Sequence, residues 1–199
     1  NTALNTENGV FSNEIVGVSV PQRRGEPRLI LEDEEYKNVK FEKIPQLRAA
    51  FSPTGTVTAA NASTMNDGAA ALILASATAV KKYDLKPLAK ILSFADTAHE
   101  SAWFTTAPTH AAPKALALAK LAVTDVDYFE VNEAFSVVPL AFNKILNIDI
   151  NKVNIHGGAV SLGHPLGASG ARIVTTLQNV LQSKDATIGC AAICNGGGG

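Results

Sequence analysis

The sequence has no long apolar run and no excess of charge of either sign. Among its 199 residues, 17 lysines and arginines stand against 18 aspartates and glutamates, which leaves a formal net charge of −1. Without a basic field, nucleic acid and anionic membranes are excluded as main partners. No segment of about eighteen apolar residues could span a bilayer, and Asn1 to Asn8 lack the charged and apolar parts of a signal peptide.

Cysteine and methionine are scarce. The two cysteines, Cys190 and Cys194, lie four residues apart in an apolar stretch. On a strand this spacing places both side chains on one face about 13 Å apart, too far for a disulfide. The one methionine is Met65, and the sequence ends with four glycines directly after an expected strand. We therefore expect a fragment of a longer protein.

Apolar residues are nevertheless sufficient for one substantial core, since 46% of the chain is hydrophobic. Charge is distributed unevenly: thirteen charged side chains fall between Gln22 and Arg48, whereas Asn154 to Gly199 holds only three. Residues 1 to about 50 contain one strand-like run, Ile15 to Val20, followed by a mixed-charge stretch that is predicted to be solvated.

From Gly55 onward, apolar runs alternate with helical patterns. The first apolar run, at 67–75, is also compatible with a helix because of its alanines. The expected strands or strand ends are 67–75, 88–95, 128–131, 153–155 and 186–194. The expected helices are 113–121, 135–145 with Pro139 in its first turn or at a kink, and 173–181. This alternation predicts a layered α/β architecture with helices over a buried sheet.

Three polar and glycine-rich passages each follow an expected strand: Asn132 to Phe135, His156 to Gly170, and Cys194 to Gly199. Ligands of α/β sheets bind where strand ends converge, so the passages are predicted to share one pocket. The glycines either relieve crowding in turns or let backbone N–H groups approach a ligand oxygen. No Gly-x-Gly-x-x-Gly pattern and no P-loop lysine occur there, which argues against a nucleotide site.

Histidine and cysteine in these passages are the side chains suited to chemistry. His164 lies between Gly163 and Pro165, and a histidine with its reference pKa of about 6.5 exchanges protons near neutral pH. His156 lies eight residues earlier, but no acidic residue or cysteine between them completes a zinc shell. Cys194 is either a small core residue or a thiol exposed to a ligand.

Together with Thr56 to Gly68, these passages resemble the signature blocks of the thiolase family. The matching blocks are Asn132-Glu-Ala-Phe, Gly157 to Arg172 with its Gly-His-Pro centre, and Cys194-Asn-Gly-Gly-Gly-Gly, in this order and spacing. The resemblance extends along the whole chain and covers about the C-terminal half of a thiolase.

The resemblance implies a layered thiolase-like α/β fold that is incomplete, consisting of the C-terminal domain and the end of the loop domain. Residues 1–54 would be the end of the loop and CoA-binding region, and 55–87 the last elements of the N-terminal domain. Residues 88–199 would be the C-terminal domain without its last strand.

The resemblance also implies condensation of two acetyl-CoA to acetoacetyl-CoA and CoA, and its reversal, through an acetylated cysteine. His164 would activate the nucleophilic thiol and donate a hydrogen bond to a thioester oxygen, and Asn132 would hold a water that completes this oxyanion site. Cys194 would be the general base toward the acetyl methyl group, and the Gly196 N–H would bind the other thioester oxygen. Neither Cys190 nor Cys194 lies in the motif of the acylated cysteine.

Coenzyme A is thus implied as a substrate. Ser63 matches a serine that contacts the pantetheine arm, with Met65 beside it. Asn38 stands where many family members have an arginine at the adenine end, which leaves Lys43 as the basic contact.

Two further features of the family have counterparts here. Phe104 matches a substrate-facing aromatic of the mitochondrial form, although Thr105 replaces the proline that follows it there. The potassium-binding subset is resembled at four residues whose carbonyls would be the ligands: Ala59, Ala60, Ala62 and Val160. No tightly bound cofactor is implied besides this ion.

Two functional interpretations remain open. The chain is part of an acyltransferase that forms a homodimer or homotetramer, soluble and intracellular, in the mitochondrion or the cytosol. Alternatively, it is a catalytically inert truncated product that at most binds CoA weakly or perturbs assembly. A ketosynthase-type enzyme is disfavoured because that group lacks the Gly-His-Pro block.

Overall fold

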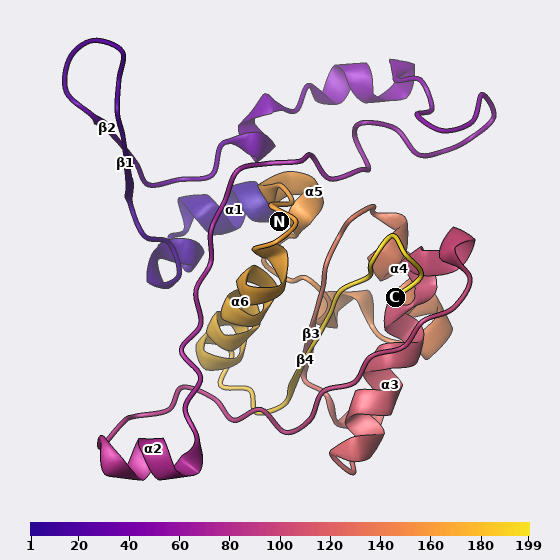
Figure 1. The fold of residues 1–199 in the computed structure, drawn as a ribbon. Helices are drawn as coiled ribbons and strands as arrows, with labels where there is room; N and C mark the ends of the chain where they lie inside the picture. The colour runs from indigo at the N-terminus through magenta and orange to yellow at the C-terminus, as the bar shows by residue number, and fades with distance from the viewer.

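The computed structural model describes residues 1–199, and its folded part is an α/β unit around two parallel strands, β3 and β4 (Figure 1). One long helix, α6, packs on one side of this pair, and α3 and α4 lie on the other (Figure 1). The bounds of these elements are α3 (Pro108–Leu118), β3 (Tyr128–Val131), α4 (Val137–Leu146), α6 (Ser169–Ser183) and β4 (Gly189–Ala192). The layered α/β architecture predicted from the sequence is confirmed.

The strand pair is short and enclosed. The last three residues of β3 are buried, which is typical of a parallel strand with helices on both faces. The strand expected at 128–131 is therefore confirmed, and the one expected at 186–194 is confirmed in a shorter form. The strand end expected at 153–155 is reduced to one parallel bridge between Val153 and Phe129.

The core fills the space between the strand pair and helices α3 and α4. Phe129 of β3 meets Phe142 of α4 edge to face, with ring centroids 5.5 Å apart, a favoured aromatic geometry. The nine buried residues of this core are Ala112, Leu116, Val126, Phe129, Val131, Val138, Phe142, Val153 and Ala192. These residues fix the ends of β3 and β4, where the polar passages begin.

The helices follow the apolar spacing of the sequence. Helix α6 buries Ile173, Leu177 and Val180 against the strands, as its pattern predicts. Helix α4 begins at Val137 and holds Pro139 in its first turn, where a missing N–H costs no hydrogen bond. None of the helices combines the length and apolarity that a membrane span requires.

The helix expected at 113–121 begins five residues earlier and ends three residues earlier, at 108–118, so this prediction was wrong at both ends. Pro108 occupies the first turn, where proline is well tolerated, and Pro113 lies inside the helix. Lys120 adopts a positive φ of 60°, a conformation outside the helical region.

The first hundred residues form short elements joined by extended chain. The strand-like run at 15–20 contributes only β1 (Val18–Val20), which pairs antiparallel with β2 (Arg28–Ile30) in a projecting hairpin (Figure 1). The other short elements of the chain are α1 (Thr2–Glu7), η1 (Val10–Asn13), η2 (Glu35–Asn38), η3 (Phe41–Gln46), α2 (Ala77–Lys82), η4 (Ser101–Thr106), η5 (Val123–Asp125), η6 (Ile150–Lys152) and α5 (Ala159–Leu162).

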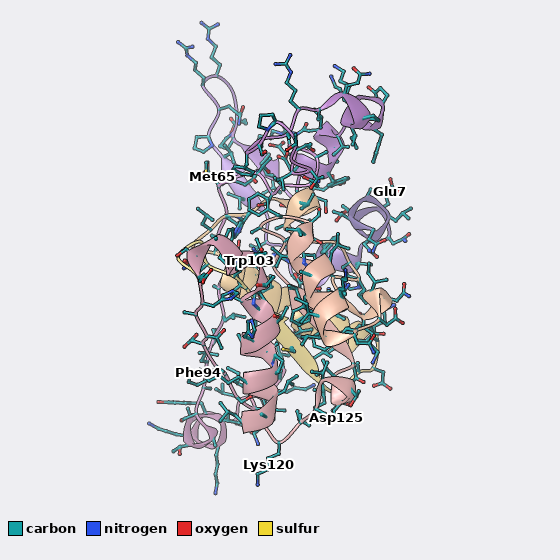
Figure 2. All side chains as sticks on the ribbon, turned by 90° about the vertical axis from the view of Figure 1, so that its right-hand side faces the viewer. Glu7, Met65, Phe94, Trp103, Lys120 and Asp125 are labelled. Carbon is teal, nitrogen blue, oxygen red and sulfur yellow. The ribbon has the colours of Figure 1, made fainter.

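The buried strands expected at 67–75 and 88–95 are absent, and both predictions were wrong. These segments run as extended chain without strand partners, and Ile73 and Phe94 are 95% and 82% exposed. Figure 2 shows Phe94 at the edge of the molecule. An extended segment becomes a strand only when a neighbouring backbone satisfies its N–H and C=O groups, and no strand of this chain pairs with these two segments.

Candidate active site

Asn132 and His164 lie in contact at the end of β3. Asn132 follows the last residue of the strand, and its backbone N–H donates to the carbonyl of Ala192 at 2.9 Å. Its side chain is fully buried, and His164 is 9% exposed. The Asn132 Nδ2 atom lies 3.3 Å from His164 Nε2. The fold thus brings together two of the residues that the sequence singles out.

The other ring nitrogen of His164 is held by Ser169. Nδ1 lies 2.6 Å from Ser169 Oγ, and that hydroxyl donates to the carbonyl of Pro165 at 3.3 Å. With its proton directed at Pro165, the Ser169 hydroxyl can accept the Nδ1 proton. In that tautomer Nε2 is unprotonated and faces the Asn132 amide. Nε2 is then the nitrogen that can take a proton.

Two effects favour the neutral form of His164. Burial lowers the pKa of its imidazole, and the nearby Arg172 guanidinium lowers it further, because both disfavour the charged ring. His156 also has a lowered pKa, from burial and from Lys184. It packs edge-on against Phe11, with ring centroids 6.1 Å apart. The two histidines therefore have separate surroundings.

Both cysteines are free thiols. Cys190 lies within β4, where burial raises its pKa to about 11. Cys194 follows the strand, is half-buried at the edge of the core, and also has its pKa raised by burial. Cys194 is thus connected to the site through β4, because Ala192, two residues earlier, accepts the Asn132 N–H.

The glycines after Cys194 form a turn against residues 97–101. His99 N–H donates to the Gly198 carbonyl at 3.0 Å, and Gly198 has a positive φ of 110° with the His99 carbonyl 2.3 Å from where a Cβ would lie. Only glycine fits there. Gly196 differs, because its N–H donates to no group of the chain and a Cβ would meet nothing within 4 Å. Its N–H is therefore available to a ligand.

The segment from Ala62 to Asn66 docks onto both polar passages. The backbone N–H and the hydroxyl of Ser63 both donate to the Ala134 carbonyl, at 3.1 and 3.0 Å. Further along, His164 N–H donates to the Thr64 carbonyl at 2.9 Å. This segment is the connection between the first region of the chain and the Asn132–His164 pair.

An open hollow of about 580 Å³ lies between residues 65–70 and residues 164–168, with His164 on its wall. Met65 is 85% exposed, and Figure 2 shows it among the outer side chains. Gly163, with a φ of 94°, passes so close to the Asn66 side chain that a Cβ would lie 2.4 Å from its Oδ1. The close approach explains why glycine precedes the histidine.

The remaining predicted contacts lie farther from this pair. Asn38 ends η2 and Lys43 lies in η3, both exposed, and neither touches the Asn132–His164 pair through a hydrogen bond. Phe104, in η4, packs edge-on against Phe135, with ring centroids 6.4 Å apart.

The four carbonyls implied for potassium lie on two segments that Glu133 and Ala134 connect. Ser63 binds the Ala134 carbonyl, and Val160 N–H donates to Glu133 Oε2 at 3.1 Å. No loop N–H donates to the carbonyls of Ala59, Ala60 or Ala62. Free carbonyl oxygens are the kind of ligand that potassium prefers, so the chemistry of these donors is compatible with the ion.

Sequence reasoning missed three side chains of the site: Ser169, Glu133 and Asn154. Ser169 lies five residues after His164 at the start of α6, so the signal was a hydroxyl at the start of a helix, five residues after a histidine. Asn154 has a left-handed φ of 48°, and its position just before a glycine-rich passage was compatible with an ordinary turn. The partners of Glu133 and Asn154 lie more than twenty residues away along the chain and could not be deduced from spacing.

Two family models match the chain. The model of the thiolase C-terminal domain matches residues 85–199, and that of the thiolase N-terminal domain matches residues 1–78. An acetyl-CoA acetyltransferase of Schizosaccharomyces pombe is 56% identical over 190 residues, which are 95% of this chain and 48% of the relative.

Relatives named as cytosolic and relatives named as mitochondrial have similar sequence identity to this chain. A cytosolic acetyl-CoA acetyltransferase of Gibberella zeae is 52% identical over 98% of this chain and 49% of the relative. A mitochondrial acetyl-CoA acetyltransferase of Bos taurus is 55% identical over 97% of this chain and 46% of the relative. The chain therefore spans about half the length of the curated relatives it matches.

Solved structures share the fold. The Bacillus anthracis acetyl-CoA acetyltransferase superposes with a TM-score of 0.94 at 36% identity, and the match covers 99% of this chain and 50% of that one. The Acat5 thiolase from Ascaris suum, solved in complex with coenzyme A, superposes with a TM-score of 0.88 at 46% identity over the same shares.

Proposed function

The chain belongs to the thiolase family, and we propose that it supplies part of the active site of an acetyl-CoA C-acetyltransferase. This enzyme condenses two acetyl-CoA to acetoacetyl-CoA and CoA and catalyses the reverse thiolysis. The observation that carries the proposal is the buried contact between Asn132 and His164, with Ser169 on the other ring nitrogen of His164. The nucleophilic cysteine belongs to a part of the protein outside this segment.

In the first half-reaction, His164 Nε2 takes the proton of that cysteine thiol. The thiolate attacks the thioester carbonyl of acetyl-CoA, the carbon–sulfur bond to CoA breaks, and the CoA thiolate leaves with the proton that Nε2 had taken. The protonated Nε2 donates to the thioester oxygen, and a water held by Asn132 completes the oxyanion site. The unpartnered, buried Oδ1 of Asn132 supports this role, because it can accept from such a water.

In the second half-reaction, the Cys194 thiolate removes a proton from the methyl group of a second acetyl-CoA. The resulting carbanion attacks the acetyl-cysteine carbonyl, and the cysteine thiolate leaves and takes up the proton that Cys194 had removed. The raised pKa of Cys194 suits this task, because a more basic thiolate is a better acceptor for a proton bound to carbon. The free N–H of Gly196 binds the oxygen on which negative charge develops.

Coenzyme A would lie along the hollow beside His164. Met65 lines this hollow, and Ser63 anchors the same segment. Lys43 and Asn38 would face the adenine end, and Phe104 the acyl group. A potassium ion held by the carbonyls of Ala59, Ala60, Ala62 and Val160 would supply a positive charge that orders this loop.

The isolated polypeptide would be inactive, because it carries no cysteine in the motif of the nucleophile. The complete enzyme would be a homodimer or homotetramer in the mitochondrion or the cytosol, compartments to which its relatives are assigned. The alternative, an inert fragment that binds CoA weakly, is supported only by this missing nucleophile.

Radiolabelled acetyl-CoA tests the proposal. We expect no acetyl adduct on the 199-residue chain and a stoichiometric adduct on the complete enzyme. In that enzyme, Cys194→Ala should still accept the acetyl group but lose condensation by about a hundredfold to ten-thousandfold, the usual contribution of a general base. A stoichiometric adduct on Cys194 itself, or equal loss of acetylation and condensation in Cys194→Ala, would overturn the assigned roles.

A further inference from the structure

The backbone just before Asn132 is held by the side chain of Asn154. Asn154 Oδ1 accepts from the Val131 N–H and Nδ2 donates to the Val131 carbonyl, each at 2.8 Å. The Asn154 amide thus makes the two backbone hydrogen bonds that a neighbouring strand would make to the last residue of β3. Asn154 is buried and has a φ of 48°, a left-handed conformation that asparagine tolerates better than most residues.

The residue just after Asn132 is held by the same amide. Asn154 Nδ2 also donates to Glu133 Oε1 at 3.1 Å. The second carboxylate oxygen, Oε2, accepts from the Val160 N–H at 3.1 Å. Gly158 leaves the necessary room, since a Cβ there would lie 2.4 Å from the Glu133 carboxyl carbon. The Glu133 carboxylate is therefore hydrogen-bonded both to the Asn154 side chain and to the backbone of Val160.

These contacts link the two halves of the site. Val160 lies in α5, and this helix ends at Leu162, just before Gly163 and His164. Glu133 adjoins Asn132 in the chain. A single carboxylate therefore spans the distance between the peptide that carries Asn132 and the helix that leads into His164.

We infer that Glu133 is a positioning residue of the thiolase reaction, which fixes Asn132 relative to His164 without touching the substrate. The inference rests on the proposed function. It differs from a merely stabilising role because Asn132 has little tolerance for displacement: its Nδ2 lies 3.3 Å from His164 Nε2, at the long end of a hydrogen bond. A further shift of about 1 Å can cost on the order of a hundredfold in rate.

Glu133→Gln and Glu133→Ala in the complete enzyme test this role. Glutamine keeps the shape of the side chain and one acceptor oxygen, but presents an NH₂ group to one of the two donors, Asn154 Nδ2 and the Val160 N–H. Alanine removes both hydrogen bonds. We expect kcat to fall about tenfold in Glu133→Gln and about a hundredfold in Glu133→Ala. KM for acetyl-CoA should be unchanged, because no contact to CoA is lost.

Asp127→Asn is the matched control. Asp127 also accepts two backbone N–H groups, from Thr187 and Ile188 at 2.9 Å each, but lies at the opposite end of β3. We expect this variant to lose thermal stability while its kcat stays within about twofold of wild type. An equal fall in kcat for Asp127→Asn and Glu133→Gln would reduce Glu133 to a general structural role and overturn the inference.

Crystal structures separate this inference from the proposed function. We expect the Asn132 Nδ2–His164 Nε2 contact to lengthen in Glu133→Gln and to be lost in Glu133→Ala. Retention of the contact in both, or a rise in KM with kcat intact, would overturn the positioning role. A wild-type enzyme without thiolase activity would instead refute the proposed function, while the structures would still decide whether Glu133 sets the contact.

Discussion

Residues 12–106 and residues 107–199 are nearly equal in length and differ sharply in how they are packed. No residue between Ser12 and Thr106 is buried, whereas the core and the Asn132–His164 pair lie entirely in the second region. The first region nevertheless carries large apolar side chains, of which Ile73 is the most exposed. Apolar composition alone therefore does not make a core; the side chains need surfaces that lie against them.

The difference also separates two kinds of site residue. Asn132 and His164 stand on elements fixed by a core, so their positions are determined by tertiary packing. Ser63 and Met65 stand on a segment that is anchored mainly by backbone hydrogen bonds to Ala134 and His164. Substitutions in the second region should therefore affect stability and the chemical step, whereas those in the first should have small effects on stability.

The largest effect on stability is expected for Phe142→Ala. Phe142 has no exposed surface, and its removal leaves a cavity against Phe129. The loss in the free energy of unfolding should be about 3–5 kcal/mol. Urea unfolding of the chain measures it, with Leu140→Ala on the same helix as control. Leu140 is 54% exposed, and its truncation should cost far less; equal losses would show that α4 is not anchored as described.

The next effect concerns the chemical step, in His164→Ala and Asn132→Ala of the complete enzyme. His164→Ala removes both the proposed thiol activator and a proposed oxyanion donor, and should cost at least about a hundredfold in kcat. Asn132→Ala removes only the proposed holder of a bridging water and should cost less. Steady-state kinetics and CoA dissociation constants of both variants test this order of the losses in kcat. Greater damage in Asn132→Ala, or mainly weakened CoA binding in either variant, would contradict the geometry.

The sequence predicted the second region far better than the first. The apolar period of α6 and the run in β3 arise from burial that this chain itself provides, so local pattern and tertiary structure agree. At 67–75 and 88–95 the apolar runs have the pattern of buried strands, but no neighbouring strand pairs with them. The sequence shows correctly that these two segments are apolar, but the prediction that they are buried was wrong, because burial depends on partners that local sequence does not specify.

The candidate site was predictable only in part. The passages containing Asn132 and His164 were recognisable, and the structure places the two residues in contact. Their supports, Ser169 and Asn154, were not foreseen, because each acts through a contact set by the fold. The roles of these residues in catalysis remain predictions.

A third effect is a pH dependence of stability caused by Glu130. This side chain of β3 is almost fully buried, and burial raises its pKa from 4.5 to about 8 although Arg172 lies 3.7 Å away and Glu133 and Glu14 contribute. Between these values the folded state keeps a proton that the unfolded state has released. The free energy of unfolding should therefore fall as pH rises from about 4.5 to about 8, and this contribution should be constant above that range.

Glu130→Gln isolates this contribution. The difference in unfolding free energy between wild type and Glu130→Gln should change with pH across that range, in favour of the variant at higher pH. Groups common to both proteins cancel in the difference. Because Arg172 offsets part of the cost of a buried charge, we expect a smaller change than that caused by Phe142→Ala. A difference independent of pH would show that Glu130 titrates near its ordinary value.

The smallest effect is expected where the two regions are compared with the same substitution. Ile73 is 95% exposed and Ile173 is 2% exposed. Truncation of a buried isoleucine removes packed surface and leaves a cavity, so Ile173→Ala should cost about 2–5 kcal/mol. Ile73→Ala removes surface that water already covers, and its unfolding free energy in this chain should stay within about 0.5 kcal/mol of wild type. A loss at Ile73 approaching that at Ile173 would show that residues 67–75 are packed, and would abolish the distinction between the two regions.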